Sequence, residues 1–219
     1  MSINEASPTF DRIAAGWYNF RHFTIFKTEL EGLTTRWKTG KLLNIGCGHG
    51  ADFLPFKDRF ELVGIDVSSE MLKFAEKFMH KHGFSAELKQ ADMRSLPFPD
   101  AYFDFGLAVA SLHHLDNVHG RLQAIQELFR VLKPGGEAFI TVWNHYQPRF
   151  FFKSSDILVP WRYKEEVIQR YYHLFSYDEI EKLVKSAGFK ILYSHPEASY
   201  RLPIKYFSRN ICLFIKKPS

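Results

Sequence analysis

The chain has 219 residues, of which 46% are hydrophobic and 24% charged, and its net charge is +5. These proportions exclude disordered and collagen-like classes, and no apolar run approaches the roughly 18 residues of a membrane span. The first residues lack the layout of a signal peptide, and two cysteines are too few for a disulfide framework or a cysteine-based zinc site. We therefore expect a cytoplasmic protein with no membrane contact and no metal site.

Segments typical of strands alternate with segments typical of helices. Short apolar runs predict buried strands, serines before helical patterns predict N-caps, and a Pro-Gly-Gly sequence predicts a helix end. In chain order we predict helices over 8–20 and 24–38, a strand over 41–45, a short helix after the glycines, a strand over 61–65, a helix capped by Ser68 or Ser69, strands over 85–90 and 103–110, a helix over 119–132, a strand over 137–143, a helix from the capping box 176–179 to Gly188, and strands over 189–195 and 209–216.

This alternation predicts the α/β fold class, as one Rossmann-like, doubly wound, mainly parallel seven-stranded sheet with helices on both faces. We expect a single domain over 1–219. Its parts are N-terminal helices (1–40), a cofactor-binding half (41–143), an insertion (144–175), and a last helix with two strands (176–219). The insertion is aromatic, basic and weakly periodic, and an insertion of that length is usually functional.

The ends of the first three predicted strands carry residues suited to a nucleoside. The first strand ends in Gly46-Cys47-Gly48-His49-Gly50, where glycines allow a sharp turn and close approach of a ligand. Asp66 follows the second strand and can accept hydrogen bonds from ribose hydroxyls, with Val67 beside it. At the third strand end, Asp92 can receive an adenine amino group and Met93 can pack on the ring. Ala108, in the fourth strand, completes the expected set. Each feature alone also fits an ordinary turn, but the three strand ends together favour a nucleoside site.

Two cofactor classes fit such a site. The dinucleotide-binding fingerprint is Gly-x-Gly-x-x-Gly, and the helix that follows it binds a pyrophosphate. In this chain the third glycine, Gly50, comes one residue earlier than in that fingerprint. Asp52 would repel a pyrophosphate and suits a positively charged amine. The sequence therefore predicts S-adenosyl-L-methionine as the cofactor.

The stretches 43–50 and 132–136 resemble the first motif and the turn before the fifth strand of class I methyltransferases. A narrower resemblance is to the tRNA wobble-uridine carboxymethyl methyltransferases, which form a methyl ester on 5-carboxymethyluridine. It rests on Asp11-Arg12-Ile13-Ala14, Arg21, Ser111-Leu112-His113-His114, Arg121, Val142-Trp143, Leu158-Val159-Pro160-Trp161 and Arg170-Tyr171-Tyr172-His173-Leu174-Phe175. The resemblance implies a tRNA substrate and a small zinc-containing activator subunit. In that family the subunit adds to a strand edge, here about 85–90, although Glu87 and Lys89 could simply discourage pairing there.

A carboxylate acceptor is already ionised at neutral pH, so methyl transfer to it needs alignment rather than proton removal. Arg21 and Arg121 are candidates to hold that carboxylate, because a guanidinium can donate two parallel hydrogen bonds; surface ion pairs are the alternative. His113 and His114 follow the fourth strand, beside the expected methyl group, where catalytic and structural roles are both open. Trp143 could form a wall of the acceptor pocket or belong to the core.

Residues 144–219 carry 13 Lys and Arg against 7 Asp and Glu, whereas residues 41–143 carry 11 against 13. A phosphate-rich partner or an ordinary basic surface would explain this excess. The insertion places aromatics beside cations, as single-stranded RNA requires; a cap over a small-molecule pocket is the alternative. Its candidate substrate residues are Trp161, Arg170, Tyr172 and His173. We therefore expect a tRNA wobble-uridine methyltransferase, with a methyltransferase for a quinone, polyketide or metabolite carboxylate as the alternative. A non-catalytic interaction protein is the third hypothesis.

Overall fold

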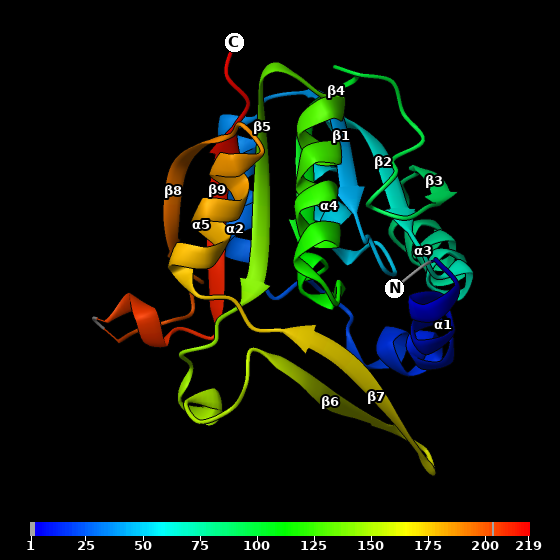
Figure 1. The fold of residues 1–219 in the computed structure, drawn as a ribbon. Coiled ribbons are helices and arrows are strands. Elements are labelled where there is room, and N and C mark those ends of the chain that lie inside the picture. The colour runs from blue at the N-terminus through cyan, green and yellow to red at the C-terminus, as the bar shows by residue number, and fades with distance from the viewer. Residues whose placement is uncertain (1–2, 203) are drawn as a thin grey trace.

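The computed structural model describes residues 3–202 and 204–219. Seven strands form one sheet in the order β3-β2-β1-β4-β5-β9-β8 (Figure 1), and only β9 runs antiparallel to its neighbours. The expected doubly wound, mainly parallel sheet is therefore confirmed. The strands are β1 (Gly40–Ile45), β2 (Phe60–Asp66), β3 (Glu87–Gln90), β4 (Phe103–Val109), β5 (Leu132–Trp143), β8 (Lys190–Pro196) and β9 (Asn210–Lys216).

Helices cover both faces of this sheet because successive strand residues point to opposite faces. On one face, Leu43 packs in a cluster with α4 (Val118–Val131) and α5 (Tyr177–Ser186), the two helices nearest the viewer in Figure 1. On the other face, Leu42 packs with α2 (Lys27–Arg36), the 3-10 helix η1 (Ala51–Phe56) and Leu72 of α3 (Ser69–His82). Among the described residues, no helix is long and apolar enough to cross a membrane.

The serine caps expected from the sequence are present. The side chain of Ser68 accepts a hydrogen bond from the Met71 amide (3.0 Å), and that of Ser176 accepts one from the Glu179 amide (3.1 Å). The first helix differs from expectation: α1 (Ile3–Phe20) begins five residues early, so Pro8 lies inside it rather than in its first turn.

The segment 144–175 contains a two-stranded hairpin that the sequence did not predict. Strand β6 (Asp156–Tyr163) pairs antiparallel with β7 (Glu166–His173) and joins no strand of the main sheet. Tight hairpin turns are normally recognised by Asn or Gly at positions of positive φ. Here Lys164 adopts φ 54° instead, which left no turn signal in the sequence.

The hairpin runs beneath the carboxyl ends of the main strands toward α1 (Figure 1). Trp161 of β6 packs on Trp17 of α1, with ring centroids 5.5 Å apart. Gly16 permits this approach, since a Cβ there would lie 2.7 Å from the Tyr163 ring. Near its middle, α1 is held to α3 by Asp11, whose carboxylate accepts hydrogen bonds from the Ser68 hydroxyl (2.6 Å) and the Glu70 amide (3.1 Å). Helix α1 and the hairpin together therefore cover the end of the sheet where ligands bind in this architecture.

Candidate active site

The turn after β1 is shaped by three glycines with positive φ: Gly46 (69°), Gly48 (53°) and Gly50 (85°). A Cβ on Gly46 would lie 2.5 Å from the Cβ of Ser111, so no other residue fits without displacement. Apart from its own chain neighbours, no atom of the described residues lies within 4 Å of the position where Gly48 would carry a Cβ, so the backbone there borders open space. The turn is therefore a cradle in which main-chain atoms face a cavity.

Asp66 ends β2 beside this turn and is almost fully buried. Its two carboxylate oxygens accept hydrogen bonds from the amides of Gly48 (2.8 Å) and Ser68 (2.9 Å). Burial raises the pKa of Asp66 to about 6, because these bonds offset only part of the desolvation. Each oxygen keeps an unused lone pair, so the side chain can accept two further hydroxyl groups.

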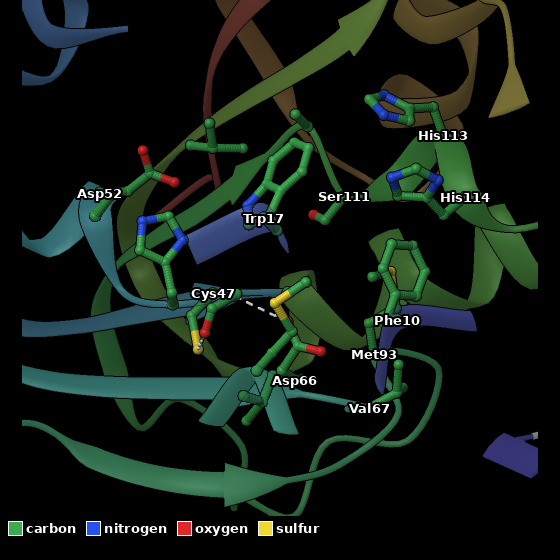
Figure 2. Close-up of a pocket in the computed structure, with 18 of the residues that line it drawn as sticks. Phe10, Trp17, Cys47, Asp52, Asp66, Val67, Met93, Ser111, His113 and His114 are labelled. Carbon is green, nitrogen blue, oxygen red and sulfur yellow. Dashed lines mark hydrogen bonds between the residues drawn. The ribbon is translucent and has the colours of Figure 1, made fainter. Parts of the chain in front are cut away.

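A second carboxylate, that of the half-buried Asp52, lines the same cavity. Figure 2 shows Asp52 and Asp66 on two sides of the turn at Cys47. Desolvation raises the pKa of Asp52 to about 6, against a hydrogen bond with Thr24 and the positive charge of Arg21. Two carboxylates held with raised pKa values favour a ligand that brings hydroxyl donors and positive charge.

Asp92 and Met93 line the cavity at the end of β3, but the Asp92 carboxylate has a protein partner that the sequence analysis did not anticipate. Arg94 donates to it from its backbone amide (2.8 Å), from Nε (3.0 Å to each oxygen) and from Nη2 (2.5 Å). Any contact between Asp92 and an adenine amino group would therefore use the lone pairs that Arg94 leaves.

The cavity measures about 200 Å³ and collects most of the residues expected from the sequence. Expected cofactor residues in its lining are Gly46, Cys47, Gly48, Asp66, Val67, Asp92 and Met93. Gly50 and Ala108 are not in the lining: Gly50 shapes the turn, and Ala108 is buried one residue before the lining residues Val109, Ala110 and Ser111. Helix α1 adds Phe10, Ile13 and Trp17 to this lining.

On the acceptor side, His113 and His114 pack with two aromatic residues. Tyr172 stacks on Trp143 (4.3 Å between centroids) and on His113 (4.9 Å), and its ring meets His114 edge-on (4.5 Å). His114 Nδ1 lies 2.9 Å from the Tyr171 carbonyl, which can only accept, so this nitrogen carries the proton. Burial lowers the pKa of His114 to about 4 and that of His113 well below its ordinary value. Both imidazoles are therefore neutral at physiological pH.

Two arginines bring positive charge to the same wall. The Arg170 guanidinium is buried and lies over the rings of Trp161 (5.1 Å), Tyr172 (5.2 Å) and Trp17 (5.9 Å). That of Arg21 lies 5.4 Å from the Trp17 ring, and burial lowers its pKa. Among the described residues, neither guanidinium lies within 4 Å of a carboxylate, and Arg170 Nε has no hydrogen-bond partner.

Three expected substrate residues lie outside the cavity lining. Arg121 occupies the buried stripe of α4 with Ala124 and Leu128, and its Nη1 donates to the Leu115 carbonyl (2.9 Å). Trp161 packs against α1. His173 lies on the opposite face of β7 from Arg170 and Tyr172, because residues along a strand alternate.

Comparison with known proteins agrees with this geometry. A family model described as a methyltransferase domain matches residues 43–140. A tRNA (carboxymethyluridine(34)-5-O)-methyltransferase of Schizosaccharomyces pombe is 31% identical over 175 residues, which cover 68% of this chain and 73% of that protein. The chain belongs to the S-adenosylmethionine-dependent methyltransferases. The matched segment 43–140 includes the glycine turn, Asp52 and Asp66.

Solved methyltransferase structures share this fold. The CcbJ methyltransferase of Streptomyces caelestis superposes with a TM-score of 0.82 at 13% identity, covering 98% of this chain and 100% of that one. A 1,6-didemethyltoxoflavin-N1-methyltransferase of Burkholderia thailandensis, solved with S-adenosylhomocysteine, gives 0.69 at 16% identity, covering 100% of this chain and 92% of that one. At these identities the likeness shows the fold. In this methyltransferase, the cradle at Gly48 and the carboxylates of Asp66 and Asp52 fit a cofactor with ribose hydroxyls and a cationic amino acid end.

Proposed function

We propose that this methyltransferase esterifies an anionic acceptor, the carboxymethyl group of a modified wobble uridine in tRNA. The observation that carries the proposal is the pair Arg21 and Arg170. The guanidiniums of the buried Arg170 and the half-buried Arg21 face the cavity without an ion-pairing carboxylate of the described chain. Buried charge without a partner is costly, so a site that keeps it favours a ligand of opposite charge. A carboxylate satisfies the guanidinium geometry with two parallel hydrogen bonds.

The protonation states of this site suit a carboxylate acceptor. When bound, S-adenosylmethionine supplies an electrophilic methyl group. A carboxylate needs no general base. Burial lowers the pKa of both His113 and His114, which makes them weak bases, so a reaction that needs no proton removal suits this site. The arginines hold and orient the acceptor, while Trp143 and Tyr172 present aromatic faces on which a base can stack.

An RNA acceptor is supported by the surface that continues from the cavity. Arg149 lies over the rings of Phe150 (4.3 Å) and the cavity residue Trp143 (5.1 Å), and Lys153 lies near Phe150 (5.8 Å). Phe152 is completely exposed next to them. Cations interleaved with aromatic side chains match the phosphates and unstacked bases of a single-stranded loop. The tRNA methyltransferase similar to this chain supports the same substrate class.

We also propose a small zinc-containing activator subunit, docked on the free edge of β3. Within the described part of the chain this strand pairs with β2 alone, and it carries the exposed ion pair of Glu87 and Lys89 (2.8 Å). Strand addition would use the main-chain groups of this edge. If the charges serve only to prevent pairing, the isolated chain is fully active.

The test is methylation of tRNA that carries 5-carboxymethyluridine, using cofactor labelled in its methyl group and mass spectrometry of the nucleosides. We expect a methyl ester, recognised by release of labelled methanol in mild alkali. The same tRNA lacking the carboxymethyl group is the control and should remain unlabelled. Methylation of a small carboxylate or quinone, with no salt-dependent tRNA binding, would replace this proposal with a small-molecule methyltransferase.

A further inference from the structure

The imidazole of His173 lies between two carboxylates from separate parts of the chain. Its Nδ1 is 2.7 Å from Oδ1 of Asp156 and its Nε2 is 2.7 Å from Oε1 of Glu179. The imidazole is buried, whereas the side chains of Asp156 and Glu179 are partly exposed. Each ring nitrogen thus has its own carboxylate partner. The arrangement is therefore an imidazole clamped between two carboxylates.

This cluster fastens the hairpin to the main domain. Asp156 begins β6 and His173 ends β7, and the two residues are paired in the hairpin register. Glu179 belongs to the first turn of α5, whose Ile180 and Val184 are buried in the core against the sheet. In a standard capping box a glutamate at this position bonds back to the cap residue. Here its carboxylate reaches His173 instead.

The hairpin strand that carries His173 also carries the acceptor-side residues. Arg170 and Tyr172 line the cavity, and Tyr171 extends the clamp by donating its hydroxyl hydrogen bond to Asp156. Strand β7 lies outside the main sheet and is not hydrogen-bonded into it as a strand. It is held by the contact of Trp161 with α1 near one end, by the ring contacts of Tyr172 and the bond between His114 and the Tyr171 carbonyl, and by the His173 cluster at the other end.

We propose that His173 is a positioning residue, whose clamp between Asp156 and Glu179 sets the placement of Arg170 and Tyr172 against the acceptor. The clamp itself follows from the contacts above; its effect on a carboxylate-bearing RNA rests on the proposed function. The cofactor side of the cavity is built on β1, β2 and β3 and does not depend on the clamp. Loss of the clamp should therefore affect acceptor binding and leave cofactor binding intact.

The experiment compares His173→Asn, Glu179→Ala and Glu179→Gln with the wild type. Glutamine can still bond the imidazole, as donor or acceptor, so Glu179→Gln should retain near-normal behaviour. In His173→Asn and Glu179→Ala we expect the acceptor KM to rise about tenfold or more, the range for loss of a charge-assisted hydrogen bond. Cofactor affinity by calorimetry should stay within about twofold of the wild type. His80→Asn, at an exposed site on α3, is the matched control.

Amide hydrogen exchange in β7 provides a readout that needs no acceptor. Exchange at residues 170–174 should accelerate in His173→Asn and Glu179→Ala and not in Glu179→Gln or His80→Asn. This result would support the clamp even if tRNA is not the acceptor. Unchanged β7 exchange and unchanged acceptor KM in folded His173→Asn would overturn the proposal. So would a parallel loss of cofactor affinity, which would indicate general destabilisation.

Discussion

The affinity of this methyltransferase for its cofactor should depend on the ionised carboxylate of Asp66. Its two oxygens are held by the amides of Gly48 and Ser68 at 2.8 and 2.9 Å, which leaves one accepting position on each for a ribose hydroxyl. A hydrogen bond to a charged group contributes about 1.5–3 kcal/mol. We therefore expect Asp66→Ala to weaken cofactor binding by at least ~1.5 kcal/mol, or more than about tenfold.

The pH dependence follows from the same geometry. Burial raises the pKa of Asp66 to about 6, so the free protein binds a proton there at lower pH. The proton must leave before both oxygens can accept hydroxyls. Affinity should accordingly approach its full value about one pH unit above this pKa, and fall by up to about tenfold per pH unit below it. Asp52, with its pKa also raised to about 6, adds its own contribution, so the slope must be assigned with single variants.

Isothermal calorimetry from pH 5 to pH 8, in buffers of different ionisation enthalpy, measures both affinity and protons released. Asp66→Asn should bind weakly with a shallower slope, and Asp52→Asn should keep the slope that belongs to Asp66. Unchanged affinity in Asp66→Ala would refute the reasoning. An unaltered slope in Asp66→Asn would show that another group titrates.

Three further outcomes are expected. Binding of tRNA should weaken steeply as the salt concentration rises, and charge reversal at Arg149, Lys153 or Lys164 should weaken it further while cofactor affinity stays constant. Filter binding at several salt concentrations measures the tRNA affinity. A flat salt response would argue against phosphate contacts. Gly32→Ala places a Cβ where no atom lies within 4 Å and should raise the free energy of unfolding by up to ~1 kcal/mol. Gly16→Ala places its Cβ against the Tyr163 ring and should give no such gain. Thermal unfolding measures both variants, and equal gains would contradict the packing of the hairpin on α1. The chain purified alone should methylate tRNA poorly and gain activity on co-expression with the small zinc-containing subunit, whereas full activity of the isolated chain would exclude an obligatory partner.

Much of the cofactor side could be predicted from the sequence because its residues follow consecutive parallel strands. Such strands end at the same edge of a sheet, so Gly46, Asp66 and Asp92 converge whatever the loops do. The conformation of the turn was also predictable, since glycines were the residues able to adopt its positive φ values. Local sequence and strand direction are sufficient for these features.

The acceptor side was less predictable because its residues depend on packing between distant segments. Arg121 and Arg170 were equally plausible in the sequence, yet Arg121 falls on the buried stripe of α4 and Arg170 on the cavity face of β7. The position of Arg170 depends on the hairpin. Its Lys164-Glu165 turn contains no glycine, so the register of the hairpin could not be inferred from the sequence.

The sequence by itself determined the class of fold, the cofactor and the carboxylates that suit it, because periodicity and strand-end chemistry are local properties. Only the tertiary structure decided that α1 lines the cavity, that Arg94 holds Asp92, and that His173 joins Asp156 to Glu179 instead of facing the acceptor. The physical reason is that the partner of a polar or charged side chain depends on how elements far apart in the chain pack together. The spacing of residues along the sequence does not specify that packing.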